Sequence, residues 1–147
     1  MRNAAALNLA IAAESGDASL FIPDEKDCNK AKCSMVSSRE RGINNEIAIK
    51  ASRVRDLEAL QHLTRCDVNK NDLEGYESVV IKELLDIINA FLPVVIFEYD
   101  TLTWAPAGAS LPEVCGLLEH YLFFDLARGI PLAPQGAPNG DILCLPR

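Results

Sequence analysis

The chain has 147 residues and a formal net charge of −7 at neutral pH. A chain of this length suits one domain and can bury roughly 70% of the surface that it exposes when unfolded. Hydrophobic residues make up 49% and charged residues 24%, which is ordinary for a globular protein. The excess of acids argues against nucleic-acid binding, because phosphate contacts depend on lysine and arginine. No apolar run approaches the ~20 residues that a membrane span needs.

The beginning of the chain resembles a signal peptide, because Met1-Arg2 precedes a short apolar stretch over residues 4–13. Asn8 interrupts this stretch, and no strong cleavage pattern follows it. We therefore expect a soluble cytoplasmic protein, with secretion as the alternative. Residues 7–13 are predicted as a strand that turns at residues 15–17 into a second strand ending at Pro23.

Residues 24–45 are polar and have no periodic pattern, which predicts a long mobile loop. Ile47, Ile49 and Ala51 then alternate with polar residues, as in a half-buried strand. Apolar residues at three-residue spacing follow and predict a short helix that ends near His62.

The most regular helical pattern covers residues 76–92, where apolar side chains form one stripe and acids stand at the start. Pro93 ends this helix. Residues 94–97 are all apolar, which is typical of a parallel strand covered on both faces. A loop of small residues over 99–109 is expected next.

Ser110 and Glu113 have the spacing of a capping box at the start of another helix. Residues 121–126 and 142–145 are predicted strands, and residues 129–140 form a connection rich in proline and glycine. Because strands and helices alternate, we expect an α/β fold with a mostly parallel sheet of five to six strands and flanking helices. Residues 94–97 are expected near its middle.

Three carboxylates follow two predicted strands. Asp72 and Glu74 lie at the turn into the helix over residues 76–92, and Glu98 follows the strand over residues 94–97. Adjacent parallel strands end on the same side of a sheet, so we expect these carboxylates to face one crevice. Solvated turn residues are one alternative, and a divalent-metal site is another, since hard cations prefer clustered oxygens.

The pattern Lys-x-Asp-x-Glu-Gly-x-Glu over residues 70–77, followed by a helix and Pro-Val-Val-Ile-Phe-Glu over 93–98, resembles the FkbM family of S-adenosylmethionine-dependent methyltransferases. The segments 8–23, 46–60, 116–124 and 141–146 also look like elements of its C-terminal half. The resemblance implies a single FkbM-type domain over residues 1–147, with a partial Rossmann-like methyltransferase fold that is truncated at its N-terminal side.

The resemblance further implies S-adenosylmethionine as cofactor and O-methyl transfer to a hydroxyl of a small molecule or glycan. Asp72, Glu74 and Glu98 would be the catalytic residues, accepting a proton from the acceptor or orienting it. The family's glycine-rich cofactor turn has no counterpart here, because none of the eight glycines forms a Gly-x-Gly cluster after an apolar strand. Weak or absent cofactor binding is therefore expected, and no cofactor-binding or metal-binding residue is assigned. The alternative is a non-catalytic remnant or interaction module, and the oligomeric state stays open.

Other residues support less specific expectations. Asn69 and Asn71 interrupt a strand that the resemblance makes central, and an unpaired buried amide costs about 1–3 kcal/mol. Trp104 is expected either to line an acceptor pocket or to pack in the core. The histidines His62 and His120, each near a helix end, are expected as capping or surface residues. The five cysteines show no Cys-x-x-Cys spacing and are expected as reduced, mostly buried thiols, with pairing or metal binding by Cys28 and Cys33 as the alternative.

Overall fold

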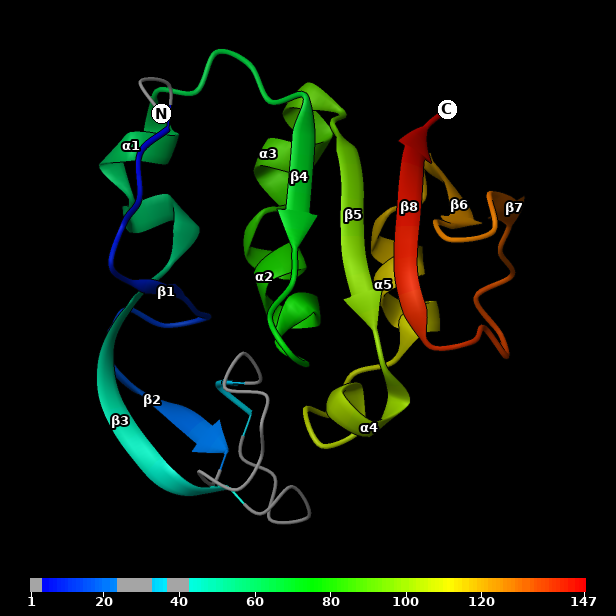
Figure 1. Cartoon of the computed structure of the whole chain (residues 1–147). Coiled ribbons are helices and arrows are strands. Elements are labelled where there is room, and N and C mark those ends of the chain that lie inside the picture. Colours follow the sequence, from blue (N-terminus) through cyan, green and yellow to red (C-terminus); the bar gives the residue numbers. More distant parts are fainter. Residues whose placement is uncertain (1–3, 24–32, 37–42) are drawn as a thin grey trace.

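The computed structural model describes residues 4–23, 33–36 and 43–147 (Figure 1). Its strands form two sheets, a three-stranded sheet of order β1-β3-β2 and a five-stranded sheet of order β4-β5-β8-β6-β7. Figure 1 shows the smaller sheet beside the β4 edge of the larger one. None of the helices in these ranges is long and apolar enough to cross a membrane.

The smaller sheet is built from β1 (Ala10–Ile11), β2 (Gly16–Pro23) and β3 (Ile43–Ser52). β2 pairs with β3 antiparallel, and β1 pairs with β3 parallel. The strand expected over residues 7–13 is therefore shorter than predicted. The expected loop over residues 24–45 is wrong at its end, because β3 begins at Ile43. Its segments 24–32 and 37–42, with Cys28, lie outside the described residues.

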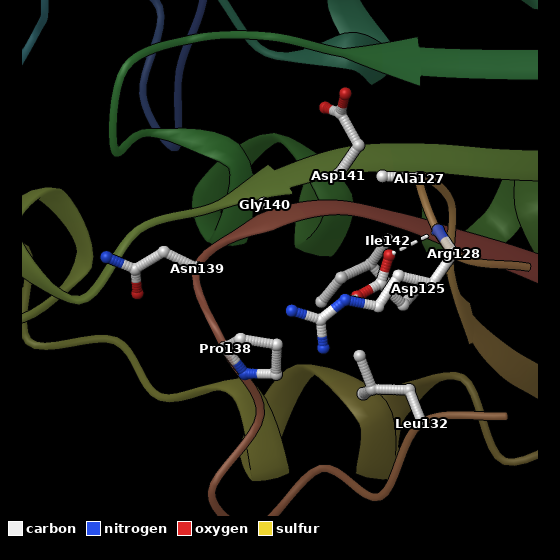
Figure 2. Close-up of a pocket in the computed structure, with 9 residues that line it drawn as sticks. All are labelled: Asp125, Ala127, Arg128, Leu132, Pro138, Asn139, Gly140, Asp141 and Ile142. Carbon is white, nitrogen blue, oxygen red and sulfur yellow. Dashed lines mark hydrogen bonds and ion pairs between the residues drawn. The ribbon is translucent and has the colours of Figure 1, made fainter. Parts of the chain in front are cut away.

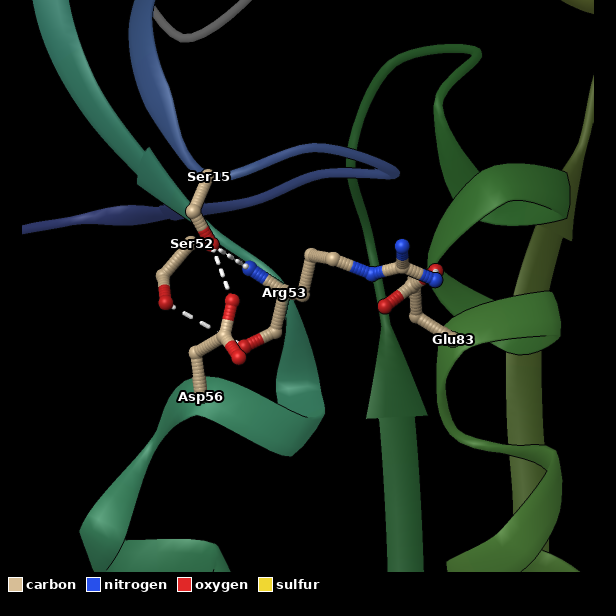
Figure 3. Close-up of polar contacts among 5 residues, drawn as sticks. All are labelled: Ser15, Ser52, Arg53, Asp56 and Glu83. Carbon is tan, nitrogen blue, oxygen red and sulfur yellow. Dashed lines mark hydrogen bonds and ion pairs between the residues drawn. The ribbon is translucent and has the colours of Figure 1, made fainter.

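A polar network joins the end of β3 to the larger sheet (Figure 3). The Arg53 backbone N–H donates to Ser15 Oγ at 3.0 Å, and the Ser15 hydroxyl donates to Asp56. The Arg53 guanidinium pairs at 3.3 Å with the carboxylate of Glu83, which lies in the helix α2 (Glu77–Glu83) beside the larger sheet. A 3-10 turn over Val54–Asp56 and the short helix α1 (Glu58–Gln61) take the place of the helix expected to end near His62.

The larger sheet contains β4 (Val68–Asn71), β5 (Val94–Tyr99), β6 (Tyr121–Asp125), β7 (Ile130–Pro131) and β8 (Gly140–Pro146). Only β4 and β5 pair in parallel, and the other neighbours in this sheet are antiparallel. The expected α/β fold with a mostly parallel sheet and flanking helices, in the form of a partial Rossmann-like fold, is therefore wrong: both sheets are mixed.

The connections explain this difference. A parallel neighbour needs a long crossover, and helical segments supply one between β4 and β5. No helix lies between β6 and β8, so the chain returns through the short strand β7 and inserts β8 antiparallel between β5 and β6. The prediction from alternating strands and helices therefore holds for β4 and β5 but not for β6, β7 and β8. β5, expected near the middle of the sheet, is an interior strand and the second of the order.

The helix expected over residues 76–92 is present as two segments, α2 (Glu77–Glu83) and α3 (Leu85–Phe91), separated at Leu84. The hydrogen bond from the Leu84 N–H to the Val80 carbonyl, at 3.0 Å, continues the helical pattern into this residue. α3 ends at Phe91, and its C-cap Leu92 has a left-handed φ of 47°, immediately before the proline that was expected to stop the helix.

Two further helices follow β5. The first, α4 (Thr101–Trp104), lies inside the stretch expected to be a loop, and Asp100 caps it by accepting a hydrogen bond from the Leu102 N–H. The second is α5 (Leu111–Leu117), with Ser110 as its N-cap. The Ser110 hydroxyl contacts the Glu113 carboxylate at 3.1 Å but does not accept a backbone N–H, so the expected capping box is only partly formed.

The main core lies between the larger sheet and its helices. Leu84 and Ile88 are buried, as expected, whereas Phe91 is only half-buried. Trp104 is 1% exposed and stacks on Phe97 with ring centroids 5.7 Å apart, which assigns it to the core rather than to an acceptor pocket. The largest fully buried residues are Trp104, Tyr121, Phe97, Ile81, Ile88, Leu111, Leu118 and Ile142.

Candidate functional site

The turn between β4 and α2 has an unusual backbone. Glu74 and Gly75 both have positive φ angles, 52° and 102°. A Cβ atom on Gly75 would lie 2.7 Å from the Thr103 carbonyl oxygen and 2.8 Å from the Thr103 Cβ. The turn thus packs directly against α4, and only glycine fits at this position without displacement of the neighbouring backbone.

Glu77 holds this turn in place. Its side chain is buried, and its carboxylate accepts hydrogen bonds from the backbone N–H groups of Leu73 at 2.7 Å and Gly75 at 2.9 Å. Burial raises the pKa of the Glu77 carboxyl, and these backbone donors oppose that rise. Sequence reasoning placed Glu77 only among the acids that favour a helix N-terminus. Its spacing after a glycine-containing turn was the available signal for its actual role.

The turn brings the three predicted site residues together. One carboxylate oxygen from each of Asp72, Glu74 and Glu98 lies within 4.8 Å of the others. Asn71, the last residue of β4, is paired with Phe97 of β5, so Asp72, which follows β4, lies beside Glu98 of β5. The three carboxylates therefore converge as expected. Their catalytic role stays a prediction.

The cluster is electrostatically crowded. Partial burial raises the pKa of the Glu98 carboxyl, and the negative charges of Glu74 and Asp72 raise it further. Asp141 of β8 is paired opposite Glu98 and adds another negative charge. The Lys70 ammonium lies 2.8 Å from the Asp72 carboxylate and offsets part of the negative charge of the cluster. Lys70 and Asp141 were not among the predicted site residues, although Lys70 stood in the motif.

A cleft of about 880 Å³ lies beside the cluster, between the smaller sheet and β4. Asp72 lies at both the cleft and the carboxylate cluster. On the far side, the Ser34 hydroxyl donates to the Glu74 carbonyl at 2.7 Å and connects residues 33–36 to the turn. The cleft is lined mainly by apolar side chains, among them Leu9, Ile11, Leu20, Leu60, Val80 and Leu84.

Two smaller hollows lie elsewhere. Figure 2 shows one of about 130 Å³ beside β8, where Arg128 pairs with Asp125 at 3.6 Å. Asn139 at its rim is held by Asp100 and by the Thr101 N–H. A shallower hollow of about 650 Å³ follows β6 and α5. Neither is lined by any of the three clustered carboxylates.

The other residues named in the sequence analysis lie outside the carboxylate cluster. β4 is an edge strand, and Asn71, 5% exposed, donates its amide to the Asn69 side chain at 2.7 Å. Cys115 and Cys144 are buried free thiols, and Cys66 is a half-buried free thiol. Cys33 is half-buried and lines the cleft. Both histidines, His62 and His120, are exposed, as expected.

Comparison of the chain with protein-family models, with curated proteins and with solved structures finds no significant match.

Proposed function

We propose that the carboxylate cluster is the acceptor side of an FkbM-like methyltransferase site, which acts on a hydroxyl of a small molecule or glycan. The observation that carries this proposal is the convergence of Asp72, Glu74 and Glu98, with oxygens within 4.8 Å of one another, where Asp72 also lines a large cleft. A ligand of this cluster must be neutral or cationic, because a further anion would be repelled.

Glu98 is the proton acceptor in this proposal. A general base works best when its pKa lies near the pH at which it operates. The pKa of Glu98 is raised by burial first and then by the neighbouring carboxylates, which moves it in that direction. Asp72 is held in an ion pair with Lys70 and instead orients the acceptor by hydrogen bonding.

The cofactor is S-adenosylmethionine, as the resemblance implies. It would supply an electrophilic methyl group, and the residues of this chain would align the acceptor with it. The sequence offers no glycine-rich turn for the cofactor's charged and hydroxyl groups. Losing several hydrogen bonds to such groups weakens binding by orders of magnitude, so we expect a dissociation constant above about 1 mM for this chain alone.

Nuclear magnetic resonance tests the acceptor side. A panel of sugars and polyols should shift the backbone amide signals of residues 72–75 and 98–99, and the variant Glu98→Gln should reduce these shifts. Glu119→Gln, at an exposed carboxylate between α5 and β6, is the matched control. Shifts confined to other residues would favour the non-catalytic remnant or interaction module. A response of the same amides to Ca²⁺ but to no polyol would instead assign the cluster to a divalent cation.

Titration calorimetry tests the cofactor. Addition of S-adenosylmethionine to the purified chain should give no saturable heat below about 1 mM. Micromolar affinity would contradict the expected weak binding and would require cofactor contacts outside the family's glycine-rich turn.

A further inference from the structure

One face of the larger sheet has no cover. Figure 1 shows α2, α3 and α5 on one side of this sheet, and no described helix lies in front of β4, β5 and β8. Strand residues that point to the helices, such as Val95, Phe97 and Ile142, are at most 1% exposed. Successive side chains of a strand point to opposite faces, and Figure 2 shows Asp141 and Ile142 on opposite sides of β8. The intervening residues of these strands therefore form an open face.

The open face is mainly apolar. The register of β4, β5, β8 and β6 places its side chains in two rows that cross the sheet. The first row, at the starts of β4 and β5, contains Val68, Val94, Leu145 and Leu122. The second row contains Lys70, Ile96, Leu143 and Phe124. Val68 is 58% exposed and Leu122 is 46% exposed. A contiguous apolar surface of this kind marks an interaction site on a folded protein.

The two ends of the open face differ in charge. At one end, Glu98 and Asp141 are paired across β5 and β8, and neither has an ion-pair partner among the described residues. At the other end, Arg147 follows β8, and its N–H donates to the His120 carbonyl at 2.9 Å. Alternation along the strand places Arg147 on the same face as Asp141. Arg147 is exposed and also has no ion-pair partner in the described part of the chain.

A two-fold axis brings two open faces together in one of two ways. If the axis runs along the strands, each row lies over itself, and the carboxylates of Glu98 and Asp141 meet those of the other copy, which is repulsive. If the axis runs across the strands, each strand lies over its own copy in the opposite direction. The first row of one copy then covers the second row of the other. The second arrangement therefore covers the apolar rows without joining the acidic ends.

This arrangement also brings opposite charges together. Its centre lies between the two rows, at the level of Cys144 in β8. Asp141 and Arg147 each lie three residues from that centre, in opposite directions along the chain. Arg147 of each copy thus lies across from Asp141 of the other. One register covers the apolar rows and pairs these charges, although the two observations are independent. We propose that two copies of this chain pack through their open faces as a two-fold dimer with antiparallel strands.

The open face is large enough for a stable dimer. Four strands about 4.8 Å apart, over seven residues of about 3.3 Å each, span roughly 19 by 23 Å, or roughly 440 Å² of flat area in each copy. Because side chains rise from this plane, two copies bury more than about 1,000 Å² of accessible surface, which is what a specific interface needs. Packed sheets keep their strand directions within about 30° of each other, and the antiparallel arrangement permits this.

Sedimentation velocity of the purified chain over about 1–500 µM tests the proposal. We expect a monomer–dimer equilibrium with a dissociation constant of about 1–100 µM in about 0.15 M salt. Leu122→Lys places a charge in the first row and should raise this constant about tenfold or more. Ile130→Lys is the matched control, because Ile130 is 50% exposed but pairs with Asp125, which shares the helix-covered face with Ile142. It should leave the dissociation constant unchanged.

Charge reversal tests the orientation of the two copies. Arg147→Glu sets two acids against each other in the dimer, and Asp141→Arg sets two cations against each other, so each should raise the dissociation constant about tenfold. The double variant, or a mixture of the two single variants, restores opposite charges at both contacts and should restore the dissociation constant. Within one copy the two positions lie about 20 Å apart along one strand, so this recovery arises only between copies.

Three results would overturn the proposal. The first is a monomer throughout the concentration range, which would leave the open face to a different partner. The second is a dimer that Ile130→Lys weakens as much as Leu122→Lys does. The third is a double variant that does not recover the affinity lost in the single variants, which would mean that Asp141 and Arg147 do not meet across the interface.

Discussion

At the scale of single residues, Gly75 determines the geometry of the carboxylate turn most directly. Its φ of 102° is strained for any other residue, and its Cα lies close to the Thr103 backbone. Glu77 secures the same turn with two hydrogen bonds to backbone N–H groups. The positions of Asp72 and Glu74 in the cluster therefore depend on two residues that need not touch a ligand.

Substitution Gly75→Ala is expected to lower the free energy of unfolding by at least about 2 kcal/mol, through backbone strain and the clash with Thr103. Gly116 provides a matched control, because it lies on α5 and a Cβ there meets no atom within 4 Å. Gly116→Ala should raise stability by about 0.5–1 kcal/mol. Urea unfolding measures both. Equal stability of the two variants would show that the turn relaxes without cost.

At the scale of elements, the edge position of β4 explains two polar residues. Asn69 and Asn71 point to one side of the strand, and their side-chain amides pair with each other at 2.7 Å. In a central strand, these amides would be hard to satisfy. At an edge, one amide partner and partial exposure of Asn69 are sufficient.

Substitution Asn69→Val should lower the free energy of unfolding by about 1–3 kcal/mol, because it leaves the buried Asn71 amide without its acceptor. The double variant Asn69→Val/Asn71→Val removes both partners and should be less destabilised than the sum of the single variants by about 1 kcal/mol. Urea unfolding of all four chains gives this difference. Additive effects would show that the amide pair contributes nothing to the stability of β4.

At the scale of the whole molecule, the buried carboxylate of Glu77 and the half-buried carboxylate of Glu98 make the free energy of unfolding depend on pH. Burial raises the pKa of Glu77 and Glu98 in the folded state. The folded protein therefore holds these protons at pH values where the unfolded chain has released them. Stability from this source is fully present below the unfolded carboxyl pKa and is lost as pH rises through the folded pKa.

Substitution Glu98→Gln removes one of these groups. Its gain in stability over the unsubstituted chain should be small near about pH 4. The gain should increase toward about pH 7, where the Glu98 carboxyl of the unsubstituted chain is ionised. Thermal unfolding across this range measures the gain. Glu14→Gln, at an exposed carboxylate before β2, measures the effect of removing a surface charge. A gain that decreases with pH would mean that Glu98 is stabilised as an anion.

The sequence alone predicted the elements with strong local patterns, such as β5 and the helical stretch that includes Ile88. It also indicated that Asp72, Glu74 and Glu98 would converge, because a helical crossover between two strands places their ends on one side of a sheet. These inferences depend on local periodicity and chain order.

The tertiary structure decided the remaining features. The direction of β8, the edge position of β4 and the burial of Trp104 and Glu77 depend on contacts between segments distant in sequence. A periodic pattern shows which face of an element is apolar but not which neighbour covers it. For this reason the mixed sheets and the cleft between the smaller sheet and β4 followed only from the packed chain.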